Sequence, residues 1–259
     1  MSDLLSTLLD GEVSQVIIGL HWTAVVTEVE DTRRCGLAST YRVSQEHHSK
    51  PDVPDAGQLA SSNGLVVAAY TQSDSPVMRS VGVAAINALL PPFTHTLVEQ
   101  NAEEVIASHG FEKRVVLVGR FPFIPRLRTR VGELTVLEIS PHPGELPESA
   151  ALDVIPAADV VAITGMTLIN HSLENLLKLC SPQARVILLG PSTPLSPVLF
   201  DYGVDLLCGS VVTDIEPVLR AISQGANFRQ VHQAGVRLIS VTQAKKSRSN
   251  HRRKEKQLC

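Results

Sequence analysis

The chain has few aromatic residues, few cysteines and no long apolar run, and each shortage excludes a class of protein. Aromatic residues make up 4% of its 259 residues, too few to suggest the stacking surface of a nucleic-acid-binding protein. The cysteines are scattered and form no C-x-x-C pair, which argues against a disulfide framework or a thiolate zinc site; they are Cys35, Cys180, Cys208 and Cys259. No apolar run approaches the roughly 18 residues that span a bilayer, so no membrane partner is expected.

Charge is unevenly placed along the chain. Residues 245–259 contain seven lysines and arginines and one glutamate, a net charge of +6, so residues 1–244 carry −9 because the total is −3. The basic segment lacks apolar periodicity and is predicted to be a disordered tail. The acidic remainder argues against nucleic acid as a partner. The first residues, MSDLLSTLLDGE, place acids where a signal peptide needs positive charge, which favours a cytoplasmic protein.

The length favours two domains, because one domain commonly has roughly 100 to 150 residues. Residues 1–97 are expected to form a small α+β domain. In it, β-rich runs at residues 13–20 and 22–30 predict a hairpin. Ser75-Pro76 is typical of a helix start, and the helix is expected to end before Pro91. Its small residues would let another element pack closely.

Residues 98–244 are expected to form a Rossmann-like domain. Asn101 is predicted to cap a helix that ends at Gly110. Five strand-like runs follow, at residues 114–118, 134–139, 160–164, 185–189 and 204–207, with helix-like segments at 173–180 and 215–224. This alternation predicts an α/β fold with a mostly parallel sheet and helices on both faces. A last run, residues 236–241, is expected at the sheet edge.

The segment from Val115 to Pro141 has the layout of a nucleotide-binding unit but lacks its glycines. A β-rich run ends at Gly119, and Glu138 follows nineteen residues later (138 − 119), where a dinucleotide-binding fold has a ribose-binding acid. The positions two and five after Gly119 need small residues but are Phe121 and Ile124. The architecture is therefore better supported than a dinucleotide cofactor.

Parallel sheets of this kind bind ligands beyond the carboxyl ends of their strands. The residues that follow the strands are therefore candidate ligand-binding residues. They are Gly119, Phe121, Pro122, Thr164, Asn170, Gly190, Ser192 and Thr193. Nothing resembles the G-x-S-x-G motif, so nucleophilic serine chemistry is not expected.

Several of these features have an ordinary structural alternative. Phe121 and Phe123 either stack on a planar ligand or pack beneath the following helix. The proline-rich loop after Gly190 either holds an anionic group or is only a turn. The nearby arginines either receive an anion or are ordinary surface residues; they are Arg120, Arg126, Arg128 and Arg130.

Candidate metal ligands occur in two places. Glu138 lies near the end of a strand expected to be buried on both faces, where a carboxylate needs a hydrogen-bond donor or a metal. His142 could join it around a divalent metal ion. In the first domain His47 and His48, together with His21, form a second candidate set, with solvated side chains as the alternative.

Five segments together are similar to a known family: SVGVAAINALL, VVLVGRFPFI, LTVLEISPHPGELP, ADVVAITG and VILLGPSTPLSPVLFDYGVDLLCGSVVTD. On these segments the chain resembles a two-domain family of unknown function that is named for heavy-metal chelation. The resemblance extends from about Gly19 to Asp214. It implies a first domain similar to the N-terminal (capping) domain of enolases, a Rossmann-like second domain, and a site in the cleft between them.

The resemblance also implies which residues form that site. They are the glycine-aromatic-proline turn Gly119, Phe121 and Pro122, the strand-end acid Glu138, the loop residues Gly190 and Thr193, and Asn87 of the small-residue helix that contains Ser80 and Gly82. The family usually has a glutamate two residues before Ser80. This chain has Met78 there. If that carboxylate is a ligand in other members, this chain has lost it, and either the site works without it or this member binds something different.

Three functions remain open from the sequence. The first is binding of a small molecule, a metal ion or a metal chelate between the domains, with a role in metal handling. The second is an enzyme that binds an adenosine-containing ligand, with Glu138 on the ribose and Phe121 or Phe123 on the base. The third is a non-catalytic scaffold. A homodimer is expected in each case.

Overall fold

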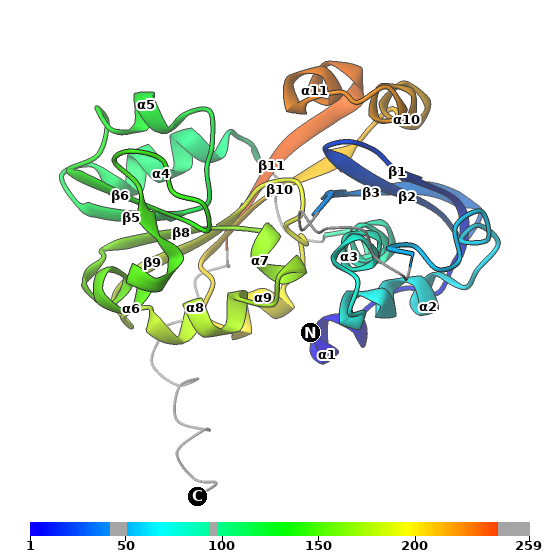
Figure 1. Cartoon of the computed structure of the whole chain (residues 1–259), viewed down its shortest axis with the longest axis horizontal. Helices are drawn as coiled ribbons and strands as arrows, with labels where there is room; N and C mark the ends of the chain where they lie inside the picture. Colours follow the sequence, from blue (N-terminus) through cyan, green and yellow to red (C-terminus); the bar gives the residue numbers. More distant parts are fainter. Residues whose placement is uncertain (42–50, 94–97, 243–259) are drawn as a thin grey trace, which may run out of the picture.

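The chain contains two β-sheets in the part described by the computed structural model, residues 1–41, 51–93 and 98–242 (Figure 1). The smaller sheet is antiparallel and consists of β1 (Glu12–Ile18), β2 (Trp22–Val29) and β3 (Thr32–Ser39). With α1 (Ser2–Leu5), α2 (Gly64–Ala68), the 3-10 turn η1 (Ala69–Gln72) and α3 (Pro76–Leu89) it forms the small-sheet unit. The remaining elements form the large-sheet unit.

The predicted hairpin is β1 and β2, in which Ile18 pairs with Thr23. Strand β3 was not predicted, because its sequence TRRCGLAS has two arginines and a glycine in place of a β-branched run. Gly36 is needed there for packing: a Cβ atom at this position would lie 2.0 Å from the Ala84 oxygen and 2.4 Å from the Ala88 nitrogen of α3. The glycine that close packing requires thus weakens the strand signal in the sequence.

Helix α3 begins and ends as predicted. Oγ of Ser75 accepts a hydrogen bond from the Met78 N–H (3.3 Å), and the helix ends at Leu89, before Pro91. The expected close packing of its small residues is confirmed on two sides. Gly82 approaches the backbone of Thr71, and Ala84 and Ala88 approach β3.

The large sheet has eight strands in the order β4-β11-β10-β9-β8-β5-β6-β7. They are β4 (Val98–Glu99), β5 (Arg114–Val118), β6 (Glu133–Glu138), β7 (Leu146–Pro147), β8 (Val160–Thr164), β9 (Arg185–Leu189), β10 (Leu206–Val212) and β11 (Val236–Thr242). The strands from β5 to β10 pair in parallel. Because the chain starts this parallel sheet in the middle, at β5, and extends it in both directions, the topology is the doubly wound one that was predicted.

One expectation about this sheet is wrong. The run at residues 236–241 was expected at the edge, but β11 lies between β10 and β4 and pairs antiparallel with both. Strand β4 covers that edge, and its two residues are too short a run to be predicted. The boundary at residue 97 and the likeness to the enolase domain stay predictions, and the tail at residues 245–259 lies outside the described residues.

Helices cover both faces of the large sheet, as expected (Figure 1). On one face α4 and α5 pack on inward side chains such as Leu117 and Ile187, and on the other face the helices from α6 to α9 pack on side chains such as Val116 and Ile163. The bounds are α4 (Ala102–Gly110), α5 (Ile124–Leu127), η2 (Glu148–Ala150), α6 (Ala151–Val154), η3 (Ile155–Ala157), α7 (Met166–Ile169), α8 (Leu173–Leu179) and α9 (Val198–Asp201). Asn101 caps α4 by accepting from the Glu103 N–H (3.0 Å).

The last two helices join the two units. Helices α10 (Ile215–Ser223) and α11 (Phe228–Gly235) pack on the small sheet, where Ala24 and Val26 of β2 meet Val218 and Ile222 of α10. Helix α3 covers the other face of that sheet, and Val25 of β2 is among the sheet side chains buried on that face. The small sheet is therefore held between a helix of its own unit and two helices of the other (Figure 1).

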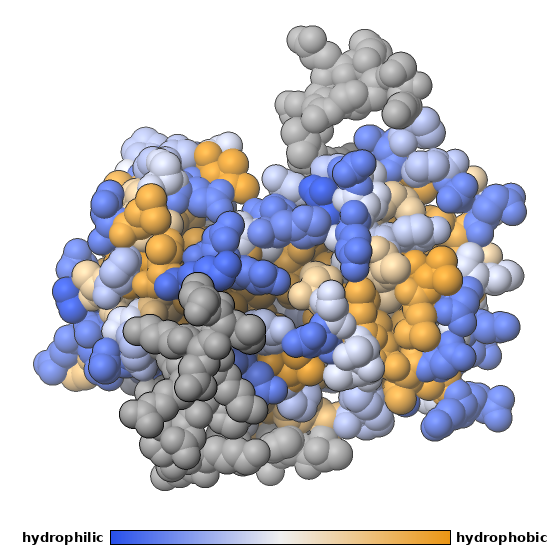
Figure 2. All heavy atoms as spheres, turned by 90° about the horizontal axis from the view of Figure 1, so that it is seen from below, coloured by the Kyte–Doolittle hydropathy of each residue, from blue (hydrophilic) through white to orange (hydrophobic). Residues whose placement is uncertain are grey.

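The surface mixes apolar and hydrophilic side chains. On the face shown in Figure 2, apolar residues gather more on the side of the small-sheet unit, and Leu65 and Val66 of α2 are among its exposed apolar residues. Within the described ranges, no helix combines the length and the apolar character needed to cross a membrane.

We expect Gly36→Ala to lower the free energy of unfolding by about 3 kcal/mol, at the upper end of the usual cost of overpacking, because the atoms it would meet belong to the backbone of α3. Gly144→Ala is the comparison: a Cβ atom there meets nothing within 4 Å, but φ is +86°, so left-handed strain of about 1 kcal/mol is the only expected cost. Urea unfolding of both variants measures the difference. Equal losses would contradict the close approach of α3 to β3.

Candidate functional site

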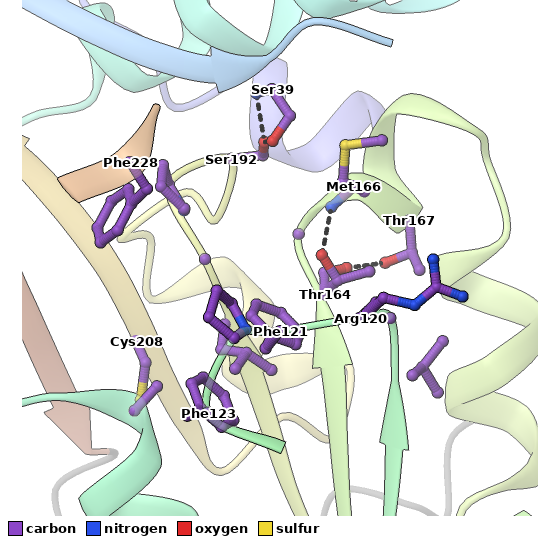
Figure 3. A pocket seen from close by; sticks show the side chains of 18 of the residues that line it. Ser39, Arg120, Phe121, Phe123, Thr164, Met166, Thr167, Ser192, Cys208 and Phe228 are labelled. Atoms are coloured by element: carbon purple, nitrogen blue, oxygen red, sulfur yellow. Dashed lines mark hydrogen bonds between the residues drawn. The ribbon is translucent and has the colours of Figure 1, made fainter. Parts of the chain in front are cut away.

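A cavity of about 970 Å³ lies between the two units, at the carboxyl ends of β5, β8 and β9 (Figure 3). The small-sheet unit contributes Trp22, Ser39 and Tyr41 to its wall. The large-sheet unit contributes the loops after four strands, the start of α4, and Phe228 of α11. Strands β5 and β8 are neighbours from which the chain continues in opposite directions, and doubly wound sheets bind ligands at such a point.

The turn after β5 places Phe121 in the cavity wall. Gly119 has φ +103°, and a Cβ atom there would lie 3.0 Å from the Thr164 side chain and 3.4 Å from the Phe121 ring. The Phe121 and Phe123 rings stack with their centroids 5.1 Å apart and an interplanar angle of 17°. Phe123 is buried and Phe121 half-buried. Phe123 therefore packs in the core, in agreement with the alternative that these rings pack beneath the following helix. Phe121 remains partly open to the cavity.

Glu138 also lines the cavity, at the end of β6. It is half-buried and not enclosed on both faces as expected, because the strand ends here and Ile139 is exposed. Its Oε1 accepts a hydrogen bond from the Arg120 N–H (2.9 Å) and its Oε2 from the Ile139 N–H (2.9 Å). Each carboxylate oxygen can accept a further bond, so a ligand-binding role remains compatible with this structural one.

Arg120 fixes the turn after β5 through Glu145. Its Nε and Nη2 donate to the two carboxylate oxygens at 3.1 and 2.6 Å, and Nη2 also donates to the Ser140 oxygen at 2.8 Å. The Arg120 hydrogen bond, together with one from the His142 N–H, lowers the pKa of Glu145 from 4.5 to about 2. The guanidinium thus has a carboxylate partner within the fold.

Of the candidate metal ligands that the structure describes, only Glu138 lines the cavity. His142 is exposed and does not line the cavity, so the structure does not place its ring with Glu138 in that wall. His47 and His48 lie outside the described residues. In the ranges that are described, no group of three or more His, Cys, Asp or Glu side chains could hold a metal ion.

Polar side chains from the loops after β8 and β9 line the cavity (Figure 3). Thr164 Oγ1 accepts from the Met166 N–H (3.3 Å), and Asn170 Oδ1 accepts from the Ser172 N–H (3.1 Å). Ser192 Oγ accepts from the Ser39 N–H (2.8 Å), which ties the loop after β9 to the small sheet. Gly190 (φ +104°) and Pro122 also belong to the wall.

Three residues taken from the family resemblance do not line the cavity: Asn87, Thr193 and Met78. Asn87 Nδ2 donates to the Leu37 oxygen (2.8 Å) and the Pro191 oxygen (3.4 Å), joining the two units behind the loop. Thr193 is buried, and its Oγ1 has no hydrogen-bond partner in the described residues. Met78 is 3% exposed within α3. These residues shape the loop and the helix and do not form the cavity surface.

Sequence reasoning missed most of the small-unit side of the wall, and it missed Glu148 and Phe228. Trp22 and Phe228 contact each other with ring centroids 5.8 Å apart. One signal for Phe228 was present, because Asn227 and Gln230 form a capping box that starts α11. No local pattern relates Trp22 to Phe228, since the contact spans most of the chain.

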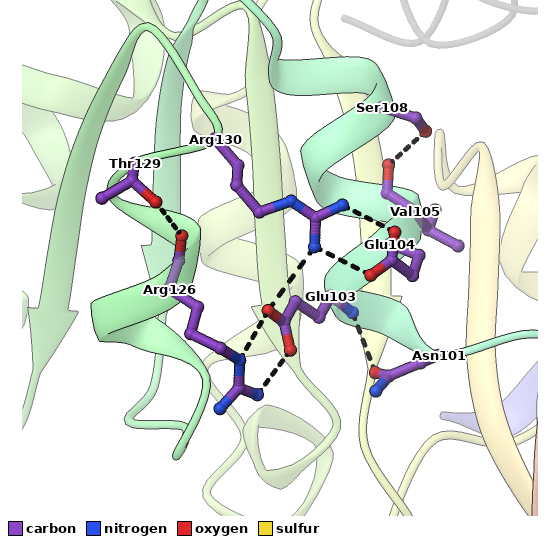
Figure 4. A network of polar contacts seen from close by, with 8 residues as sticks. All are labelled: Asn101, Glu103, Glu104, Val105, Ser108, Arg126, Thr129 and Arg130. Atoms are coloured by element: carbon purple, nitrogen blue, oxygen red, sulfur yellow. Dashed lines mark hydrogen bonds and ion pairs between the residues drawn. The ribbon is translucent and has the colours of Figure 1, made fainter.

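Two of the arginines after the turn, Arg126 and Arg130, are paired with glutamates (Figure 4). Arg126 donates to buried Glu103 from Nε (3.0 Å) and Nη2 (2.7 Å), and Arg130 donates to Glu104 at 2.8 and 2.6 Å. These hydrogen bonds raise the pKa of both arginines and lower that of Glu104. Arg128 donates to backbone oxygens. These arginines therefore have partners within the fold, which argues against the alternative of an anion-binding cluster.

The comparison with protein families identifies the chain. A family model described as “Putative heavy-metal chelation” matches residues 101–240, and a second model with the same description matches residues 1–90. The chain belongs to this family. The resemblance found in the sequence is therefore confirmed.

Two solved members of the family have the same overall fold. One, a protein of unknown function from Desulfitobacterium hafniense, has a TM-score of 0.80 and 25% identity over 93% of this chain and 97% of its own. The other, of unknown function from Pyrococcus horikoshii, has a TM-score of 0.77 and 20% identity over the same shares, and its likeness shows the fold alone. An uncharacterized Methanocaldococcus jannaschii protein is 29% identical over 150 residues, which is 55% of this chain and 58% of that relative.

Lowering the pH should remove the stabilisation that Glu145 provides. Its pKa in the folded protein, about 2, lies below the ordinary 4.5. Its contribution is therefore present above pH 4.5 and is lost as the pH falls toward 2. We expect Glu145→Gln to flatten the decline of unfolding free energy over this interval, as measured by urea unfolding at several pH values. Glu133→Gln, at an exposed position of β6, is the control. Identical slopes for wild type and Glu145→Gln would refute the assignment.

Glu103 should matter for stability and Glu104 should not. The Glu103 side chain is 7% exposed and that of Glu104 is 54% exposed. We expect Glu103→Gln to lower the free energy of unfolding by about 1–2 kcal/mol, because charged hydrogen bonds are lost at a buried position. Glu104→Gln should change it by less than about 0.5 kcal/mol. Thermal unfolding of the two variants measures the difference. A larger loss of stability in Glu104→Gln than in Glu103→Gln would show that Glu103 does not hold α4.

Proposed function

We propose that the cavity between the two units binds an organic ligand that carries a metal ion, and that the protein takes part in metal handling through this chelate. The observation that carries the proposal is the composition of the cavity wall. The wall is mostly apolar and comes from both units, while the described residues offer no set of three metal-binding side chains. The volume of about 970 Å³ is that of a site for an organic molecule.

A bare heavy-metal ion is poorly matched by this wall. Such ions take three or four nitrogen or sulfur ligands from a protein. The single thiol in the wall, Cys208, accepts a hydrogen bond from Ser240 (3.3 Å), and burial raises its pKa to about 11, so it remains protonated. The carboxylates of Glu138 and Glu148 also line the wall. Two carboxylates can complete the coordination of a metal ion whose other ligands arrive with an organic chelator.

The nucleotide alternative has less support. In dinucleotide-binding folds a pyrophosphate approaches the backbone of the first glycine turn and the start of the following helix. Here the Phe121 ring lies against Gly119, and α5 has only four residues, so it supplies little helix dipole. The scaffold alternative does not account for a cavity of this size.

The test compares a metal ion with its chelates on the full chain. We expect nickel complexes of phenanthroline or ethylenediamine to raise the melting temperature and to change the fluorescence of Trp22, because the chain's only tryptophan lines the cavity. Free Ni²⁺ should do neither at the same concentration. Glu138→Gln should weaken the binding of the complexes roughly 10-fold, as losses around a metal site commonly do.

Glu133→Gln is the matched control on the same strand, since its side chain is exposed and lies outside the cavity wall. The proposal is wrong if free Ni²⁺ binds as tightly as every complex, or if no complex binds. A response to ATP, NAD or adenosylmethionine without a response to chelates would favour the nucleotide alternative instead.

A further inference from the structure

The aromatic residues of this chain are concentrated around one cavity. The sequence has ten of them, one tryptophan, three tyrosines and six phenylalanines. Five line the cavity between the units: Trp22, Tyr41, Phe121, Phe123 and Phe228. A chain that is poor in aromatic residues thus places half of them where a ligand would bind. Burial in the core does not explain this, because Phe121, Trp22 and Tyr41 are only half-buried.

Phe121 is held in a fixed orientation. Its ring stacks on Phe123 on one side, and Pro122 stiffens the turn between them. Ring atoms of Phe121 lie 3.4 Å from the Cβ position of Gly119 and 4.0 Å from that of Gly190. Glycine at both turns keeps side chains away from the ring. Such a ring loses little conformational entropy when a ligand stacks on it.

The charges in the wall do not favour a phosphate-bearing ligand. Arg120 is paired with Glu145 at 2.6 Å, and Arg126 with Glu103 at 2.7 Å. Neither guanidinium is left without an anion in the fold. A ligand therefore gains its affinity mainly from ring stacking and apolar contact, with polar edges available at the Thr164 hydroxyl and the Asn170 amide.

The second aromatic pair links the two units across the cavity wall. Trp22 belongs to β2 of the small-sheet unit and Phe228 to α11 of the large-sheet unit, and their rings meet at an angle of 59°. The Trp22 Nε1 is buried without a hydrogen-bond partner in the described residues. Figure 3 shows Phe228, Phe121 and Phe123 around the same space. Ring surfaces thus reach the cavity from two separate parts of the fold.

From this arrangement we infer that the ligand of the cavity is a flat, conjugated chelator without phosphate groups, which stacks on the Phe121 ring. The inference rests on the proposed binding of a metal chelate and adds the chemical class of its organic part. It differs from the nucleotide hypothesis because it requires no contact with a phosphate or a ribose.

The test uses two complexes that differ in their rings. Phenanthroline and ethylenediamine each bind Ni²⁺ through two neutral nitrogen atoms, so their complexes have equal charge, but only phenanthroline is flat and conjugated. We expect calorimetry on the full chain to show roughly 3- to 10-fold tighter binding of the phenanthroline complex, the range that an aromatic pair provides. Phe121→Leu should abolish the preference, and Phe121→Tyr should retain it.

Phe111→Leu is the matched control, because Phe111 is 65% exposed and lies outside the cavity wall; it should leave the preference unchanged. If Phe121→Leu does not fold, wild type and Phe121→Tyr still give the ratio of the two complexes. Equal affinity of wild type for both would overturn the inference and leave the proposed function standing.

Two further outcomes separate the inference from the proposed function. If neither complex binds, both are wrong. If metal-free phenanthroline binds as tightly as its nickel complex, the stacking inference is supported and the role of the metal is overturned. A preference that persists in Phe121→Leu would overturn Phe121 as the stacking surface.

Discussion

The packing of α10 and α11 on the small sheet is the contact on which the cavity depends. These helices follow the last parallel strand, yet they bury Ala24 and Val26 of a strand near the start of the chain. The resulting apolar contact sets the small sheet beside the carboxyl ends of β5 and β8. Trp22 and Ser39 of this sheet line the same cavity as the loops of the large sheet. Apolar burial far from the polar loops therefore determines the shape of the site.

The parts of the fold that the sequence predicts are those with a complete local signal. Helix α3 has Ser75 and Pro76 at its start and a proline pair after its end, and the parallel strands are short, continuous apolar runs. Strand β3 was missed because Gly36 serves the contact with α3, and glycine lowers the strand signal. Helix α11 was missed although Asn227 and Gln230 form a capping box at its start, because its only fully buried apolar residue is Val231 and its apolar content is low. In β3, therefore, tertiary packing overrides local preference.

The site residues also divide into those that the sequence predicts and those that depend on tertiary packing. Residues that follow the strands of a parallel sheet can be predicted from topology alone, and Gly119, Thr164 and Ser192 all line the cavity. Asn87 and Thr193 were named through the family resemblance, and the structure places both behind the wall, where they join the two units or support the loop. Trp22, Tyr41 and Phe228 required knowledge of how the units dock. No spacing rule along the chain carries that information.

Met78, at the position where the resemblance implies a glutamate, has a simple physical role in this chain. Met78 lies in the first turn of α3, is 3% exposed, and is absent from the cavity wall. A carboxylate at a site this buried needs a partner, since an unpaired buried charge costs several kcal/mol. Methionine fills the same space without that requirement. Methionine at this position therefore contributes to the packing of α3 and leaves the carboxylates of the cavity wall, Glu103, Glu138 and Glu148, in place.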